Sequence, residues 1–276
     1  MHRIVILLLT LVAGLAQQRP AETPLEKAVV EYRNGNFEGA LDILEQAIKE
    51  NPEGPDFYAL RGDIYSYQGR SSQAVENYTK MVELRPESGA GHYRRGMEYF
   101  RMIQLEKAIA DFERVAELHP EKAPQLWQLG ICYYYNGDFA KGRKLFESHQ
   151  TVNKQDVENA VWHLLCAAKL EGFEKAQAQL IPIEGDRRVP MAQVHSVFAG
   201  KAKPEDVLQA VEVGNPNPEE LKSRLFFAHL YLGLFEEARG HAEASLNHIR
   251  KAAIDYSQKH YMGDVARVHL ALREKK

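Results

Sequence analysis

The sequence predicts an all-α protein in which pairs of antiparallel helices stack side by side into a solenoid. The first observation is an internal repeat, in which small, bulky and helix-ending residues return at a fixed period: Gly62 as Gly96, Tyr65 as Tyr99, Ala74 as Ala108 and Pro86 as Pro120. These positions recur every 34 residues, and a period of this length is typical of repeat architectures. The second observation is the chemistry of the repeated positions. The small residues let two helices cross closely, the rings fill the space beside the crossing, and the proline ends the second helix because it lacks an N–H group. Each pair leaves one apolar side uncovered, so neighbouring pairs must stack.

The two copies resemble the tetratricopeptide repeat (TPR) family. They read Tyr58-x2-Arg61-Gly62-x2-Tyr65…Ala74-x3-Tyr78…Pro86 and His92-x2-Arg95-Gly96-x2-Tyr99…Ala108-x3-Phe112…Pro120, with a large residue and Arg in place of the family's Trp and Leu. The match continues upstream at Ala28, Ala40 and Pro52, and downstream at Gly130, Tyr133 and Phe146. The resemblance implies a right-handed TPR solenoid of helix pairs, whose first helices line a concave surface.

Residues 1–16 form a separate N-terminal segment. A short positive start at His2-Arg3 precedes an apolar run, and Gly14-Leu15-Ala16 offers a small-x-small cleavage site. This pattern predicts a secretory signal peptide cut before Gln17, and hence a periplasmic or secreted protein with no integral membrane span after cleavage. The alternative is an uncleaved membrane anchor, although the apolar run is short for a helix that spans a bilayer. Residues 17–23 are expected to be a polar spacer.

Four TPR-like helix pairs are expected over residues 24–152. Pro24 suits a first helical position, and Asn34-Gly35-Asn36 is the expected turn of the first pair. The fourth pair is expected to begin near Pro124, with a turn at Asn136-Gly137-Asp138.

Residues 153–214 are expected to hold a degenerate pair and two short helices. In the fourth pair the turn is followed by the pattern Gly137-x-Phe139-x2-Gly142, and Gly172-Phe173-x2-Ala176 repeats this pattern with one residue missing. The segment from Ile181 to Pro190 then interrupts the array of helix pairs. The short helices are expected at Met191 to Ala199 and at Glu205 to Val213, each followed by a glycine.

Residues 215–276 are expected to form a final TPR-like pair and a capping helix. Gly233-x-Phe235-x2-Ala238 is interpreted as the turn of that pair, because it repeats the same formula. The last segment, through Tyr261, Val265 and Val268, is expected to cap the stack with a polar outer face, as the end of a solenoid requires.

The order of these parts is similar to the NlpI type of exported bacterial TPR protein. Local similarity lies at Tyr231-Leu232-Gly233-x-Phe235 and at His260-Tyr261-Met262-Gly263. The resemblance implies an adaptor that docks cell-envelope enzymes such as wall hydrolases, synthases or proteases. That family carries a lipid on an N-terminal cysteine, which is not found in this chain after the apolar run, so export without a lipid is expected.

Composition and spacing give no reason to expect catalysis or a cofactor. The chain is 45% hydrophobic and 26% charged with a net charge of −3, which gives no indication of nucleic-acid binding. No His-Glu-x2-His or Cys-x2-Cys pattern occurs, and the spacings of His229, His241 and His248 do not gather all three on one helix. No nucleophilic triad is recognisable either. The sequence therefore predicts neither an enzyme nor a metal site.

Cys132 and Cys166 lie one period of the repeat apart. Equivalent positions on neighbouring helices are about 8–10 Å apart, whereas disulfide-bonded Cα atoms usually lie within about 7 Å. Buried free thiols are therefore the preferred prediction, and a disulfide is the alternative.

The predicted binding surface is an aromatic groove on the concave side of the first helices. Tyr, Trp, Met and Arg are enriched in protein contacts and carry much of their energy. Positions one turn away from the packing face supply the candidates: Tyr32, Arg33, Asp63, Ser66, Tyr67, Tyr93, Met97, Phe100, Arg101, Trp127, Ile131, Tyr134 and Tyr135.

The expected function is a non-catalytic scaffold or adaptor of the cell envelope that binds an extended peptide or a helix of partner proteins in this groove. The alternative is a structural subunit of a secretion or outer-membrane assembly complex. A homodimer through the first pair or the terminal helix stays open.

Overall fold

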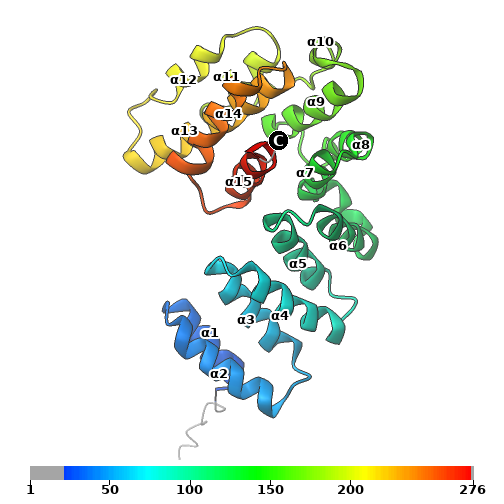
Figure 1. The fold of residues 1–276 in the computed structure, drawn as a ribbon, viewed down its shortest axis with the longest axis vertical. Helices are drawn as coiled ribbons and strands as arrows, with labels where there is room; N and C mark the ends of the chain where they lie inside the picture. The colour runs from blue at the N-terminus through cyan, green and yellow to red at the C-terminus, as the bar shows by residue number, and fades with distance from the viewer. Residues whose placement is uncertain (1–21, 275–276) are drawn as a thin grey trace, which may run out of the picture. The chain divides into compact units, whose positions relative to one another are not determined.

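The computed structural model describes residues 22–274, and within this range the chain forms helices, turns and loops without a β-strand (Figure 1). The all-α prediction is confirmed. The chain divides into two compact units, residues 1–52 and 53–276. The predicted signal peptide, and the spacer up to residue 21, lie outside the described residues.

The N-terminal unit is a single helix pair, α1 (Pro24–Arg33) and α2 (Phe37–Glu50). Thr23 starts α1 through a capping box with Glu26, in which each side chain binds the other residue's backbone N–H. The expected turn lies between the helices, with Gly35 at φ +77°. Ala28 of α1 and Leu44 of α2 are fully buried in the interior of the pair.

The C-terminal unit begins with three further helix pairs. Their helices are α3 (Pro55–Tyr67), α4 (Ser71–Leu84), α5 (Gly89–Arg101), α6 (Leu105–Leu118), α7 (Trp127–Asn136) and α8 (Phe139–His149). In each pair a glycine of the first helix meets a ring of the second helix at the same spacing along the chain: Gly62 meets Tyr78, Gly96 meets Phe112 and Gly130 meets Phe146. A Cβ atom on Gly62 would lie 2.5 Å from Tyr78 Cε1, which is closer than van der Waals contact allows. The glycines are therefore required by the close crossing of the helices.

A second contact between the two helices explains why Arg replaces Leu in the repeat. Arg61 Nε donates to Asn77 Oδ1 at 2.7 Å, and Arg95 donates to both carboxylate oxygens of Asp111 at 2.7 and 2.8 Å. Asp111 is buried and also binds His92 Nδ1 at 2.9 Å. The arginine side chains thus pair with buried polar groups of the following helix, where the family has an apolar contact.

The fourth pair begins three residues later than expected. Pro120–Gln125 forms a 3-10 helix (η1), and α7 starts only at Trp127. The expectation of a start near Pro124 was wrong, because Pro124 lies inside this 3-10 segment and the α-helix follows it.

The middle of the chain is organised around α9 (Val157–Glu171), which is buried on nearly every side. α10 (Phe173–Gln177) completes the degenerate pair. The two short helices α11 (Met191–Phe198) and α12 (Pro204–Ala210) lie where the sequence predicts them.

The last pair differs from the expectation. α13 (Pro218–Ala238) runs without a break through Gly233, and the turn to α14 (Ala242–Arg250) lies at Arg239–His241. A Cβ atom on Gly233 would lie 2.7 Å from Ile249 Cδ1 on the second helix of the pair. Gly233 is therefore the crossing glycine of this pair, and its interpretation as a turn residue was wrong.

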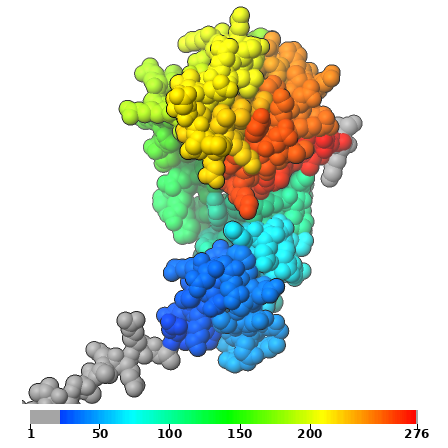
Figure 2. Space-filling view, turned by 90° about the vertical axis from the view of Figure 1, so that its left-hand side faces the viewer, coloured from blue at the N-terminus to red at the C-terminus, as the bar shows by residue number. Residues whose placement is uncertain are grey.

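The C-terminal helix is not a cap with a polar outer face. A π-helical turn, η2 (Lys251–Asp255), leads to α15 (Tyr261–Glu274), whose residues Tyr261–Ala266, Val268 and His269 are buried. Figure 1 shows α15 between α7 and the α13–α14 pair, and α15 also contacts α5. In Figure 2 the orange-red start of this segment lies against the cyan part of the C-terminal unit, where Lys259 Nζ is 5.9 Å from the Tyr67 ring centre.

Among the residues that the structure describes, none of the helices combines the length and the apolar character needed to cross a membrane.

Replacing the crossing glycines with alanine tests the origin of the helix pairing. A Cβ atom at position 130 would lie 2.6 Å from Phe146 Cζ, and one at position 96 would lie 3.2 Å from Phe112 Cε1. We expect Gly130→Ala to lower the free energy of unfolding by about 1–3 kcal/mol through overpacking. Gly96→Ala should lower the free energy of unfolding by less, because its crowding is milder. The higher helix propensity of alanine, worth about 1 kcal/mol, can offset that crowding. Urea denaturation followed by circular dichroism measures both, and equal effects of the two substitutions would contradict the crossing argument.

Candidate functional site

The concave side of the helix pairs in the C-terminal unit is occupied by the chain's own C-terminal helix. The Tyr261 ring stacks on Phe100 with ring centres 5.0 Å apart and meets Trp127 edge-on at 5.1 Å. At the other end of α15, Tyr135 Oη lies 3.0 Å from His269 Nδ1. Phe100, Trp127 and Tyr135, three of the aromatic residues that the sequence assigns to the groove, each contact α15.

Three predicted groove residues are therefore not accessible. Phe100, Ile131 and Tyr134 are no more than 3% exposed. The prediction that these side chains line an open groove was wrong, because Tyr261 of α15 packs on Phe100, Trp162 of α9 packs on Tyr134, and Ile131 is buried. Trp127 and Tyr135 are half-buried in the same contact.

Charged side chains fix both ends of α15. Near its N-terminal end, Arg101 Nε donates to the buried Asp264 at 2.9 Å, and Arg101 also binds Glu98 and Ser66. Near its C-terminal end, Arg273 donates to Glu237 of α13 through Nε at 2.6 Å and Nη2 at 2.7 Å. These ion pairs set the register of the helix on the surface beneath it.

The other predicted residues remain at least partly accessible. Tyr32 and Arg33 belong to the N-terminal unit, where Tyr32 packs on Phe37 with ring centres 5.8 Å apart. In the C-terminal unit, Tyr67 is 62% exposed. The side chains of Asp63, Tyr93, Arg94 and Met97 are half-buried, and Asp63 and Arg94 form an ion pair at 2.9 Å. We refer to Asp63, Tyr67, Tyr93, Arg94 and Met97 as the open stretch.

A cavity of about 390 Å³ lies where the N-terminal ends of α9 and α15 meet. We refer to it as the α9 pocket. Its walls combine five aromatic rings, one histidine and one methionine with three charged groups and one amide: Trp127, Phe146, Asp156, Glu158, Asn159, Trp162, Arg188, Phe227, His260, Tyr261 and Met262. The volume falls in the range of about 300–1,000 Å³ that is usual for ligand sites.

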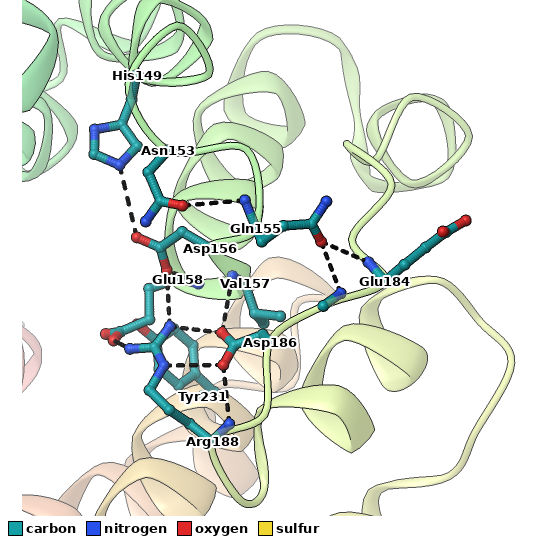
Figure 3. A network of polar contacts seen from close by, with 11 residues as sticks. His149, Asn153, Gln155, Asp156, Val157, Glu158, Glu184, Asp186, Arg188 and Tyr231 are labelled. Carbon is teal, nitrogen blue, oxygen red and sulfur yellow. Dashed lines mark hydrogen bonds and ion pairs between the residues drawn. The ribbon is translucent and has the colours of Figure 1, made fainter.

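One arginine holds the charged side of the α9 pocket together (Figure 3). Arg188 donates to Asp156 at 2.9 Å, to Glu158 at 2.5 Å and to Asp186 at 2.6 Å. Tyr231 Oη donates to the second oxygen of Glu158 at 2.6 Å. Asp156 also accepts from the backbone N–H of Glu158 and so starts α9.

The protonation of these groups follows from their surroundings. Burial raises the pKa of Glu158 above its usual value, although Tyr231 and Arg188 act against this. Burial also acts on Asp156, but its contacts with His149 and Arg188 outweigh it and lower the pKa. His149 Nε2 lies 3.7 Å from Asp156, and that contact raises the pKa of His149.

Two buried polar atoms of residues that line the α9 pocket have no hydrogen-bond partner: Trp162 Nε1 and Asn159 Oδ1. Trp162 is 2% exposed and Asn159 3%. The sequence analysis did not single out either residue. Their helical spacing on α9 is visible in the sequence, but the residues that surround them come from α7, α8, α13 and α15.

The histidines of the last pair lie in two separate contacts, and both cysteines are buried. His229 Nδ1 lies 2.8 Å from His248 Nδ1, and burial lowers the pKa of His229 to about 4, whereas His241 pairs with Glu236. Within residues 22–274 no group of three or more His, Cys, Asp or Glu side chains is arranged to hold a metal ion. Cys132 and Cys166 are free and buried, as preferred, and burial raises the pKa of both thiols to about 12.

Comparison with known proteins places the repeats in a family. A model of the tetratricopeptide repeat family matches residues 25–89, 60–120 and 93–156. The Protein SGT1 homolog of Bos taurus is 26% identical over 137 residues, which are 50% of this chain and 30% of that protein. The chain thus spans less than a third of the length of this curated relative.

Two solved structures share the fold. A tetratricopeptide repeat protein from Parabacteroides merdae superposes with a TM-score of 0.58 at 19% identity, covering 91% of this chain and 97% of that one. The MamA protein superposes with a TM-score of 0.54 at 18% identity, covering 64% of this chain and 92% of that one. At these identities the likeness concerns the fold alone.

The Glu237 cluster predicts how stability depends on pH. Burial opposes the ionisation of Glu237, but His269 and Arg273 outweigh it and hold its pKa well below its usual range. A carboxyl group with a lowered folded-state pKa stabilises the fold above its unfolded pKa of about 4.3, and this contribution is lost as the pH falls further. We therefore expect the free energy of unfolding to fall between about pH 5 and pH 3.

Glu237→Gln isolates this contribution. At pH 7 it should cost about 3 kcal/mol, because Arg273 and Lys169 lose a buried partner. The free energy of unfolding of this variant should also fall less steeply below about pH 5 than that of the wild type. Glu243→Gln, an exposed change on α14, is the matched control. Urea titrations at several pH values supply the measurement, and an unchanged pH slope in Glu237→Gln would refute the assignment.

Proposed function

This chain is a tetratricopeptide repeat protein, and on that premise we propose that it is a non-catalytic scaffold that binds other proteins through the concave side of its repeats. Stacked repeats of this kind create extended concave surfaces that serve as binding sites. The proposal concerns an exported protein of the cell envelope, in keeping with the signal-like pattern of residues 1–16.

The observation that carries the proposal is the docking of α15 on α5 and α7. The helix α15 lies on rings of the first helices through Tyr261, and charged pairs at Asp264 and at Arg273 orient it. Helix-in-groove recognition uses the same combination, with apolar anchors for affinity and charges for register. The concave surface therefore has the chemistry that binding a partner's helix or peptide needs.

The place left for a partner is the open stretch. Tyr67 is one of the few large apolar side chains of the described residues that are strongly exposed. Tyr93 and Met97 continue the surface along α5, and the Asp63–Arg94 pair supplies polar contacts at its edge. Aromatic residues and Met are enriched where proteins meet.

The partners that we propose are envelope enzymes, such as wall hydrolases, synthases or proteases. The support is the NlpI-like order of elements, in which the helix pairs are followed by two short helices and then by a final helix pair. A structural subunit of a secretion or outer-membrane assembly complex is the alternative, and the stoichiometry of captured partners separates the two.

Affinity capture from an envelope extract with the tagged full chain tests the proposal. The wild type should retain several partners in less than equimolar amounts. In Tyr67→Ala/Met97→Ala, capture should fall at least tenfold, since loss of two contact residues costs about 1–2 kcal/mol or more. Val213→Ala, which removes another strongly exposed apolar side chain just beyond α12, is the matched control.

The readout is quantitative mass spectrometry, with circular dichroism to show that each variant is folded. A single equimolar partner would favour the structural-subunit alternative. Equal capture by the wild type and the double variant would refute the open stretch as the docking surface.

A further inference from the structure

We propose that the α9 pocket binds the basic side chain of an arginine or lysine in a partner peptide. The inference rests on the proposed scaffold function and names the partner chemistry that this pocket selects. Three independent features of the pocket support it: two unpaired polar atoms, an excess of negative charge, and walls of aromatic rings.

The unpaired atoms call for one donor and one acceptor. Asn159 Nδ2 already donates to the Phe146 carbonyl oxygen at 3.0 Å, so Oδ1 is the free group of this amide, and it can only accept. Trp162 Nε1 can only donate. Leaving such groups unpaired in a buried place is costly. A guanidinium or ammonium supplies N–H groups to Asn159, and a backbone carbonyl of the same peptide can accept from Trp162.

The charges favour a cation. Three carboxylates, Asp156, Glu158 and Asp186, share the single positive charge of Arg188. His149 faces Asp156 from α8, and this contact raises the pKa of His149. His260 at the opposite wall has a pKa lowered by burial and stays neutral. The pocket therefore keeps a negative excess that disfavours an anionic ligand.

Glu158 adds a specific reason for a cation. Of the three carboxyl groups, it is the one whose pKa is raised, because burial outweighs its contacts with Tyr231 and Arg188. Arg188 binds one of its oxygens and Tyr231 the other, within the network drawn in Figure 3. A positive charge entering the pocket would lower the cost of its ionised form.

The aromatic walls suit the stem and the head of a basic side chain. Trp127, Trp162 and Tyr261 line the cavity, and Phe227 in the same lining stacks on His260 with ring centres 5.7 Å apart. Guanidinium and ammonium groups bind favourably over such rings, and the methylene stem buries apolar surface. A quaternary ammonium would use the rings as well, but it has no N–H group and would leave Asn159 Oδ1 unpaired.

Both tryptophans of the chain line this pocket, so intrinsic fluorescence reports on it without a label. The probe is a capped five-residue peptide with arginine between two leucines, titrated into the full chain. The matched peptide carries citrulline, which has the same shape without the charge. We expect a saturable fluorescence change with arginine, at least tenfold weaker binding with citrulline, and weaker binding at high salt.

Three variants connect the binding to named atoms, with calorimetry as the readout. Trp162→Phe keeps a ring but removes the N–H group, and Asp156→Asn keeps a cap for α9 but removes one charge. Each should weaken arginine-peptide binding about fivefold, the worth of one hydrogen bond or charge contact. Glu184→Gln is the charge control, because this exposed side chain points away from the network in Figure 3. It should leave binding unchanged.

The results separate this inference from the scaffold proposal. Equal binding of the citrulline peptide, or of an aspartate peptide, overturns the assignment of a basic ligand. Tetramethylammonium competing as strongly as the arginine peptide overturns the role of Asn159. Partner capture that depends on Tyr67 and Met97, with no arginine-peptide binding, overturns the pocket inference and leaves the scaffold standing.

Discussion

The close crossing of two helices at a glycine is the constraint on which the rest of the structure depends. At Gly62, Gly96, Gly130 and Gly233 the first helix of a pair has no side chain, and a bulky residue of the second helix fills the gap. This brings the two helices of each pair together at one fixed height. It also directs the next positions of the first helix, one turn around, toward the concave side. The rings of α5 and α7 meet α15 because the crossing leaves them no place inside their own pairs.

Much of this could be predicted, because a repeat encodes its packing locally. The period of the repeat locates the pairs, and the crossing glycines and rings follow from it. The error at Gly233 shows the limit of matching short formulas. Gly233 was compared with the turn glycine Gly137, yet Ser245 and Ile249 follow Gly233 at the same spacings at which Gly142 and Phe146 follow Gly130. The correct register was therefore present in the sequence.

The position of α15 could not be predicted in the same way. Its contacts join residues far apart in the chain, such as Arg101 with Asp264 and Tyr135 with His269. Nothing in the local pattern of residues 261–274 distinguishes a helix that caps a stack from one that lies within its hollow. A hint was available in its composition, since Tyr261, Val265 and Val268 are more apolar than an exposed end needs. The α9 pocket was hidden for the same reason, because segments that are distant in the sequence form it.

The energetics of α15 decide where a partner can bind. Burying Tyr261, Val265 and Val268 contributes about 1.5–3 kcal/mol for each side chain, and stacking on Phe100 adds about 0.5–1.5 kcal/mol. The buried ion pairs of Asp264 and Glu237 contribute less on balance, since desolvation offsets their attraction, but they fix the register. A partner that displaced α15 would have to replace all of these apolar contacts. A partner that binds the open stretch and reaches into the α9 pocket gains new contacts without this cost. The segment before α15 reaches both places, because Lys259 lies near Tyr67 and His260 lines the α9 pocket. One peptide that follows this segment would contact both, so that α15 acts as a fixed part of the binding surface.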